Sequence, residues 1–344
     1  MQTRIRQITT DSLCCEPILR RTPGGDLLCV AQIGDVTEPA PGNRVYFFRS
    51  SDNGDTWSKR ELIRPEDGTA VYLTEVSVIG KKIIVYLTLH NGNFADWRSD
   101  RAVSDDDGFT WRSIGPLKGY ETYTFPRGMI RLRDGTLCMA CQYYPIGPEE
   151  NRRLSENGLK VWQTETCACV RNDLLFSRDE GETWTAFPGP VLPLIREGKR
   201  KWVWSEPTVL ELADGDIAML LRFCGTGSLY RSTFHRDTKN FDEALPTDIP
   251  NPANKPKLLR MEDGRIALLH TPCAVQGFAG RNPLSVWFSK DEMKTFSDRH
   301  VISDFPGAFC YPDGVAEGEH ILFSIEHNRH TVLFFDVDTG GEKT

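Results

Sequence analysis

The chain has 344 residues, a formal net charge of −7, 26% charged residues and 39% hydrophobic residues. The excess of acidic side chains leaves no basic field for a phosphate backbone, so we expect no nucleic-acid partner. The balance of charged and apolar residues is that of a folded globular protein and excludes a disordered chain. The apolar stretches are much shorter than the ~20 residues of a membrane-spanning helix, so we expect no membrane partner.

The residues that follow Met1 are polar and basic, without the apolar segment of a secretory signal. The sequence therefore predicts a cytoplasmic protein. Several of the ten cysteines lie inside apolar runs, as Cys29 does, so we expect reduced thiols in the core and not a disulfide framework. Cys138 and Cys141 have the spacing of a metal-binding pair, but residues three apart on a strand point to opposite faces. We expect no metal site there.

An eight-residue pattern, Ser-x-Asp-x-Gly-x-Thr-Trp, recurs along the chain. It occupies residues 50–57, 104–111 and 177–184, and a fourth copy at residues 289–296 lacks the Gly and the Trp. These residue types suit a hairpin turn, in which Ser and Asp bond to the backbone, Gly takes a positive φ and Trp packs below. We therefore assign the aspartates of the pattern a structural role.

A second repeat joins two short apolar strands through Asp-Gly or Gly-Gly. It defines six units that begin near residues 16, 75, 126, 206, 255 and 311, each with about four strands. This organisation predicts an all-β fold, a six-bladed β-propeller that forms one domain over residues 1–344. Residues 4–8 are expected to supply the outer strand of the last blade. Residues 145–166 are predicted to form a long loop over one face, either a functional wall or a variable insertion.

Inner strands of a propeller converge on its axis, so the residues that begin them should line one end of the central channel. They form a polar ring, which consists of Glu16, Glu75, Arg127, Glu206, Lys255 and Tyr311. The ring as a whole indicates a functional site, whereas Glu75 or Lys255 alone would fit a structural ion pair equally well. The candidates for substrate contacts in the ring are Glu16, Glu75, Arg127 and Lys255.

The turn pattern and the blade spacing resemble those of the sialidase (neuraminidase) superfamily, over about residues 12–338. Members of that superfamily are six-bladed propellers whose turns are called Asp boxes. They bind a sugar carboxylate with three arginines, use a Tyr–Glu pair as the nucleophile and use an Asp as the acid/base. The resemblance implies the same fold and a glycan or oligosaccharide as the substrate.

Four functional positions of the superfamily are matched in the expected order and blades. Glu206 starts the inner strand of the fourth unit and Arg222 ends the next strand, which implies the roles of tyrosine partner and second arginine. Arg281 precedes the last copy of the turn pattern and Tyr311 follows it, which implies the third arginine and the nucleophile. A phenol suits this role because it approaches an anomeric carbon beside a substrate carboxylate without charge repulsion.

Two further positions are less closely matched. The acid/base of the superfamily falls within residues 32–38 of this chain, where Asp35 is the first choice and Glu38 the second. Where sialidases open the first blade with Arg-Ile-Pro, this chain has Cys15, Glu16 and a proline. The first arginine is thus missing, and a clamp without it holds a carboxylate less well.

The sequence therefore predicts a sialidase-like glycoside hydrolase and not a strict sialidase. Its substrate would be an acidic or polar glycan terminus, with Tyr311 as the nucleophile, Glu206 as its base and Asp35 as the proton donor. Arg222 and Arg281 would bind the anionic group. The scheme requires no metal and no cofactor.

Two alternatives remain open from the sequence. In a polysaccharide lyase, Tyr and one of His90, His270 or His327 would remove the proton next to a uronate carboxylate. In a non-catalytic carbohydrate-binding propeller, the missing arginine would mark the loss of the reaction. The sequence carries no indication of the oligomeric state.

Overall fold

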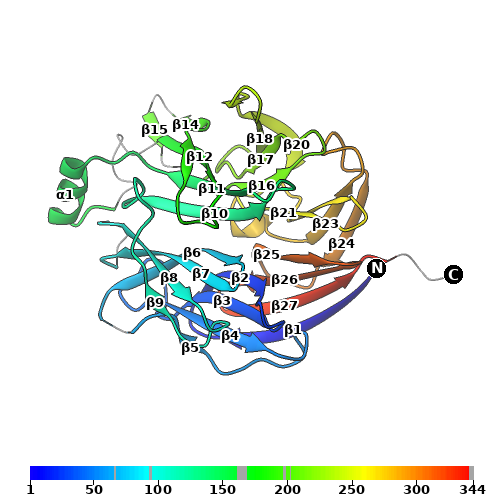
Figure 1. Ribbon diagram of the computed structural model, residues 1–344, viewed down its shortest axis with the longest axis horizontal. Coiled ribbons are helices and arrows are strands. Elements are labelled where there is room, and N and C mark those ends of the chain that lie inside the picture. The colour runs from blue at the N-terminus through cyan, green and yellow to red at the C-terminus, as the bar shows by residue number, and fades with distance from the viewer. Residues whose placement is uncertain (66, 93–94, 161–168, 197–198, 202, 341–344) are drawn as a thin grey trace.

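The computed structural model describes residues 1–340 except 66, 93–94, 161–168, 197–198 and 202. Its strands form six antiparallel sheets arranged as the blades of a propeller (Figure 1). The predicted six-bladed β-propeller is therefore confirmed, and each of the six sequence units corresponds to one sheet.

The first three blades contain the strands of the N-terminal half. The first comprises β2 (Cys14–Arg21), β3 (Leu27–Ile33), β4 (Arg44–Ser50) and β5 (Glu61–Leu62). The second comprises β6 (Ala70–Ile79), β7 (Lys82–His90), β8 (Arg98–Ser104) and β9 (Arg112–Ser113). The third comprises β10 (Thr124–Arg131), β11 (Leu137–Tyr143), β12 (Cys169–Ser177), β13 (Thr185–Phe187), β14 (Val191–Arg196) and β15 (Lys199–Lys201).

The remaining blades follow in chain order. The fourth comprises β16 (Thr208–Glu211), β17 (Ile217–Leu221), β18 (Ser228–His235), β19 (Asn240–Phe241) and β20 (Leu245–Pro250). The fifth comprises β21 (Lys257–Arg260), β22 (Ile266–His270), β23 (Leu284–Ser289) and β24 (Asp298–Ser303). The sixth comprises β25 (Phe309–Glu317), β26 (His320–His327), β27 (Thr331–Asp338) and β1 (Gln2–Thr10).

The two ends of the chain close the ring in the sixth blade. β1 pairs antiparallel with β27, from Gln2 opposite Asp338 to Thr10 opposite Thr331. Figure 1 shows the two strands side by side, in blue and red. The expected outer strand at residues 4–8 lies within β1, so the N-terminal segment pairs as predicted.

Apolar side chains fill the space between neighbouring blades. Strands alternate their side chains between two faces, so each blade packs against the blade before it and the blade after it. Cys138 and Cys141 of β11 accordingly lie in different apolar clusters. Eight cysteines are free thiols, six of them buried, while Cys167 and the side chain of Cys169 lie outside the described part of the chain.

The recurring eight-residue pattern forms the same turn in each of its copies. In the copy at residues 177–184, the Asp179 carboxylate accepts hydrogen bonds from Thr183 N at 2.9 Å and from Thr183 Oγ1 at 2.5 Å. The Ser177 hydroxyl accepts from Gly181 N at 2.9 Å. These bonds hold the turn together and leave the aspartate exposed on the outside of the blade.

The segment at residues 145–166 is not a loop throughout, which corrects the sequence prediction. Residues 148–156 form the helix α1 (Pro148–Glu156), and residues 161–166 lie outside the described part of the chain. α1 begins with a proline and two glutamates, which favour a helix N-terminus. A search of the described helices for a long apolar membrane span found no candidate.

Candidate active site

The inner strands are distorted where they reach the centre of the propeller. The pairing of β2 with β3, of β10 with β11 and of β25 with β26 shifts register near these strand ends, as a β-bulge does. Glu16, Glu206 and Tyr311 have positive φ angles of 52°, 25° and 57°. Such backbone costs about 1–3 kcal/mol per residue and is typical of functional sites, where it redirects a side chain.

A pocket of about 550 Å³ lies among these strand ends. It is lined by Glu38, Tyr72, Trp204, Glu206, Arg222, Cys224, Phe278, Arg281, Tyr311 and Arg329. Four of the lining side chains are aromatic and three are cationic. An aromatic surface beside fixed charges suits a ligand that has both an apolar face and an anionic group.

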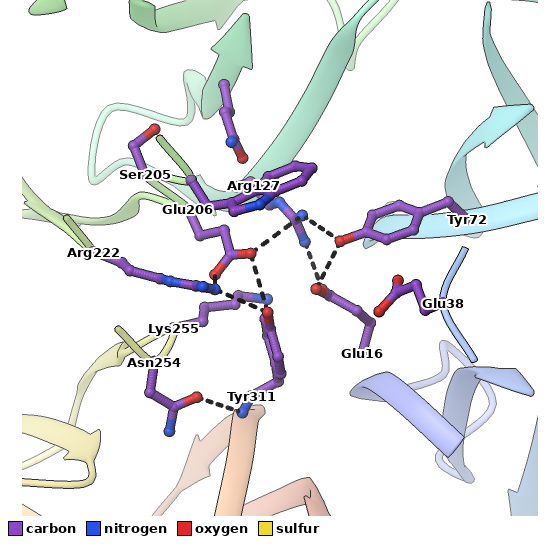
Figure 2. A network of polar contacts seen from close by, with 12 residues as sticks. Glu16, Glu38, Tyr72, Arg127, Ser205, Glu206, Arg222, Asn254, Lys255 and Tyr311 are labelled. Atoms are coloured by element: carbon purple, nitrogen blue, oxygen red, sulfur yellow. Dashed lines mark hydrogen bonds and ion pairs between the residues drawn. The ribbon is translucent and has the colours of Figure 1, made fainter. Parts of the chain in front are cut away.

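Tyr311, Glu206 and Arg222 form one hydrogen-bonded group in this pocket (Figure 2). The Tyr311 hydroxyl donates to Glu206 Oε1 at 3.3 Å and accepts from Arg222 Nη1 at 2.8 Å. Arg222 Nη1 also donates to Glu206 Oε2 at 2.5 Å. The phenol therefore has a base and a cation within direct contact.

The charges around this group favour ionised Glu206 and a protonated phenol in the free protein. Burial opposes ionisation of Glu206, but Arg222 and Arg127 outweigh it and lower the pKa of the carboxyl group below its usual value. Burial raises the pKa of the Tyr311 hydroxyl well above its usual value, although Arg222 opposes the shift. In the free protein the proton therefore stays on Tyr311, with the unprotonated Glu206 beside it.

Arg281 differs from the other two arginines of the pocket. Arg222 pairs with Glu206 and Arg329 pairs with Glu38, whereas Arg281 has no carboxylate partner among the described residues. Its Nη2 donates to the backbone oxygen of Ala253 at 2.8 Å, and its guanidinium lies 5.6 Å from the centre of the Tyr311 ring. No ion pair joins Arg281 to a carboxylate of the described residues. A buried, unpaired guanidinium is costly, so it favours binding of an anion.

Glu16 and Arg127, two of the predicted substrate contacts, lie behind the pocket wall and do not line it. Arg127 Nη1 donates to Glu16 Oε2 at 2.6 Å, and the Tyr72 hydroxyl donates to Glu16 Oε1 at 2.8 Å (Figure 2). Both charged side chains are fully buried. In this structure the two charged groups bond each other and the Tyr72 hydroxyl.

Glu75 and Lys255, the other two predicted substrate contacts, belong to a second buried network. Asp313 accepts from Arg20 at 2.5 Å, from Lys257 at 3.1 Å and from Lys255 at 3.3 Å, and Arg20 bonds Glu75 at 2.5 Å. Arg20 and Lys257 line a separate cavity of about 590 Å³. Glu75 and Lys255 are thus held by ion pairs to Arg20 and to Asp313, and neither is among the residues that line the pocket.

The structure separates the two candidates for the proton donor. The carboxylate of Asp35, the first choice, accepts from Val36 N at 2.8 Å and from Gly42 N at 3.1 Å and so holds its own loop together. Asp35 does not line the pocket, whereas Glu38, the second choice, does. Of the two candidates, Glu38 is thus the one that the loop places at the pocket, together with Tyr72.

Several pocket residues are absent from the sequence prediction, namely Tyr72, Trp204, Cys224, Phe278 and Arg329. Arg329 forms an ion pair with Glu38 across the pocket wall. Its signal in the sequence is the charged segment at residues 326–330, which lies within the sixth unit, at the turn between β26 and β27. The aromatic residues carry no such signal, because each comes from a segment without a repeated motif.

The histidines that would serve a lyase do not reach the pocket. Burial lowers the pKa of His90 to about 4 and that of His270 to about 3, so both are neutral side chains of the interior. His327 bonds the backbone oxygen of Pro306 at 3.1 Å. No histidine is among the described residues that line the pocket.

Within the described ranges, no group of three or more His, Cys, Asp or Glu side chains is arranged to hold a metal ion. The buried carboxylates near the pocket face arginines or lysines instead, as Glu206 faces Arg222 and Asp313 faces Lys257.

Comparisons with known proteins agree with this architecture. The family model described as a BNR repeat-like domain matches residues 75–323. The Hadza microbial sialidase Hz136 aligns with a TM-score of 0.73 and 18% identity over 96% of this chain and 66% of that chain. A protein of unknown function from Dyadobacter fermentans aligns with a TM-score of 0.71 and 16% identity over 97% and 98% of the two chains.

The Trypanosoma rangeli sialidase, solved in complex with sialic acid, aligns with a TM-score of 0.68 and 16% identity over 96% of this chain and 55% of that chain. This chain thus spans no more than about two thirds of the two sialidases, and at these identities the likeness concerns the fold. No curated protein matches. Because the family model covers well over half of the sequence, the chain belongs to the BNR repeat-like domain family.

Proposed function

We propose that the protein is a glycoside hydrolase that acts on an acidic or polar glycan terminus, with Tyr311 as its nucleophile. The observation that carries this proposal is the contact of the Tyr311 hydroxyl with both Glu206 and Arg222 inside a pocket of sugar-compatible size. A buried tyrosine needs an adjacent base and a cation to become nucleophilic, and this phenol has both.

The first chemical step would use these three side chains together. The Tyr311 oxygen attacks the anomeric carbon while its proton passes to Glu206, and the bond to the leaving oxygen breaks. Arg222, at 2.8 Å from the phenol oxygen, stabilises the negative charge that develops there. Arg281 pairs with the anionic group of the substrate and holds the sugar over Tyr311.

Glu38 is the proposed proton donor for the leaving oxygen. It lines the same pocket as Tyr311 and comes from the loop between β3 and β4. In the second step, Glu38 would accept a proton from water as the water attacks the anomeric carbon and releases Tyr311, which recovers its proton from Glu206. The reaction thus balances without a metal or an external base.

The test is release of sugar from a panel of aryl glycosides and acidic oligosaccharides that includes sialosides and uronides. Tyr311→Phe and Glu206→Gln are each expected to lower turnover by about a hundredfold or more, because each removes one partner of the proton transfer. Tyr46→Phe is the matched control, since Tyr46 lies in β4 and not at the pocket.

Three results would contradict the proposal in different ways. Turnover within a few-fold of wild type in both variants would exclude the Tyr–Glu pair. An unsaturated product that absorbs in the near ultraviolet would identify a lyase. Binding of a glycan without turnover, unchanged in Tyr311→Phe, would identify a carbohydrate-binding propeller.

A further inference from the structure

Arg329 reaches the pocket from an unusual direction, the turn between β26 and β27. Asn328 and Arg329 have positive φ angles of 56° and 62°, which are typical of a tight hairpin turn. The backbone oxygen of Arg329 accepts a hydrogen bond from Cys14 N at 2.7 Å. The turn of the sixth blade is therefore fixed against the first strand of the first blade.

This anchoring places Arg329 beside Cys15, the position at which the first blade lacks an arginine. The thiol of Cys15 is buried, and burial together with Glu38 raises its pKa while Arg329 opposes the shift. Glu38 and Arg329 are therefore the charges that act most strongly on this position. Cys15 supplies no guanidinium at this wall of the pocket, and Arg329 supplies one from the neighbouring turn.

Two carboxylates compete for this guanidinium. Arg329 Nη2 donates to Glu38, and Arg329 Nε lies 3.7 Å from Glu326 Oε1. Glu326 is fully buried, whereas Glu38 lies at the pocket and, among the described residues, otherwise accepts a hydrogen bond only from Gln32 Nε2, at 3.3 Å. Glu38 is therefore the partner that an incoming anion can replace, because it can move toward the open pocket.

We propose that the carboxylate of an anionic glycan displaces Glu38 from Arg329 and that Glu38 then takes up a proton from solvent. This inference rests on the proposed function, because the protonated Glu38 is the acid that the leaving oxygen requires. The exchange moves one proton from solvent to Glu38 and breaks no covalent bond. The arginine that pairs with Glu38 in the free protein thus becomes the third arginine for the substrate.

Loss of a cation and approach of an anion both favour the neutral form of a carboxyl group. The titratable and polar groups that face Glu38 come from β2, β3, β6 and the end of the sixth blade, and they are Cys15, Glu16, Gln32, Tyr72, Glu326 and Arg329. Of these, Arg329 is the cation in direct contact with Glu38. Its capture by a ligand therefore removes the main stabilisation of the Glu38 anion.

The experiment is calorimetric titration of N-acetylneuraminate and of glucuronate near neutral pH, in two buffers that differ in ionisation enthalpy. Both acids are fully ionised there, so a proton that is taken up goes to the protein. The wild type is expected to take up a measurable fraction of a proton, up to one, per bound acid. Glu38→Gln is expected to bind the acid with less proton uptake than the wild type.

Variants of the two neighbouring charged residues separate the possible sources of the proton. Arg329→Met is expected to lower the affinity for the acid by about tenfold or more, because a direct charged contact is lost. The affinity for the neutral methyl ester of the same acid should stay unchanged. Arg329→Lys keeps the charge and should restore part of the affinity. Glu326→Gln is the matched control, in which proton uptake should persist. Thermal unfolding of each variant checks that the fold is retained.

The outcomes distinguish this inference from the proposed function. Binding without proton uptake, or uptake that persists in Glu38→Gln and disappears in Glu326→Gln, would overturn the inference alone. Binding with uptake but with turnover unaffected by Tyr311→Phe would overturn the proposed nucleophile alone. Failure of both acids to bind would overturn the inference and the anionic substrate together.

Discussion

At the scale of single residues, the pocket pairs each reactive group with a neighbour that controls its charge. Glu206 stays ionised because two arginines outweigh its burial, and it can therefore accept the proton of Tyr311. Glu326 is the contrasting case. Both of its oxygens are buried and neither has a hydrogen-bond partner within the described part of the chain, although Arg329 lies 3.7 Å away.

The stability of the fold should depend on pH through Glu326. Burial raises the pKa of its carboxyl group to about 7, although Arg329 and Arg281 oppose the shift. A carboxyl group whose pKa is higher in the folded state is neutral in both states below the unfolded value. It destabilises the fold progressively as pH rises from the unfolded to the folded value, and the loss is constant above that. From its ordinary value of about 4.5, this shift amounts to on the order of 3 kcal/mol.

Glu326→Gln is therefore expected to match the wild type in unfolding free energy near pH 4.5 and to exceed it above pH 7. Urea denaturation at a series of pH values would measure the difference. A difference that stays constant across the series would show that the carboxyl group does not titrate in this window. The control is Glu243→Gln, whose carboxyl group is exposed in the loop between β19 and β20.

The sequence predicted the pocket residues that lie at repeated positions and not those held by long-range pairing. Glu206 and Tyr311 begin inner strands, so the repeat and the family motifs both point to them. Lys255 occupies an equivalent position, yet Asp313, in another blade, draws it into an ion pair. Arg329 reaches the pocket because its turn bonds Cys14 of the first blade, and no local pattern reports that contact.

At the scale of elements, the same bonds tie the inner hairpins of the third and fifth blades to the patterned turn of the same blade. Arg131 at the end of β10 donates to the backbone oxygen of Gly135 at 2.9 Å and to both oxygens of Glu180. Arg260 at the end of β21 repeats this arrangement with Gly264 and Glu292. The glutamate in each case follows the aspartate of the eight-residue pattern, so the turn also orients the inner strand.

Loss of one turn aspartate should make the fold less stable at neutral pH and no less stable in acid. Hydrogen bonds from the Thr183 hydroxyl and the Thr183 backbone lower the pKa of Asp179 to about 2. A carboxyl group with a lowered pKa stabilises the fold above its unfolded value, and that stabilisation is lost as pH falls through the folded value. Asp179→Asn is thus expected to lower Tm by a few degrees at pH 7, with the difference vanishing toward pH 2.

Differential scanning calorimetry at the two pH values would measure this effect. Asp248→Asn is the matched control, because Asp248 is exposed in β20 outside the repeated pattern. An equal loss of Tm in both variants, or a loss by Asp179→Asn that persists at pH 2, would contradict a specific role for the turn.

The helix α1 shows why one element escaped the sequence analysis. Its single buried side chain is Leu154, so its sequence lacks the apolar periodicity by which a helix is recognised. Arg152 pairs with Glu156, and Arg153 pairs with Glu150, on its exposed surface. A helix stabilised by acidic residues in its first turn and by surface ion pairs looks like a polar loop when apolar spacing is the criterion.

At the scale of the whole molecule, the number of blades can be predicted from local repeats. Closure of the ring instead depends on the pairing of the two ends of the chain. Three intact turn patterns and six hairpins mark the blades without reference to one another. β1 has mostly exposed side chains and little apolar character. Its pairing with β27 was therefore predicted from the closure of a six-bladed ring and not from the residues of β1 themselves.

Closure by β1 should contribute strongly to stability although few of its side chains are buried. Arg4 bonds Asp336 at 3.0 Å and Asp55 at 2.6 Å, and Ile8 is the buried residue of the strand. Without residues 1–10, β27 becomes an open edge with unpaired backbone groups, which favours pairing with other chains. The shortened chain is expected to lose more than about 5 °C in Tm and to self-associate.

Addition of a peptide with residues 1–10 to the shortened chain tests whether strand pairing is the cause. The peptide should restore part of the lost Tm in proportion to its concentration, because a ligand that binds only the folded state stabilises it. A peptide of the same composition in scrambled order should have no effect, since it cannot match the register from Gln2 to Thr10. An unchanged Tm after the truncation would mean that the contacts between neighbouring blades hold the ring closed without this strand.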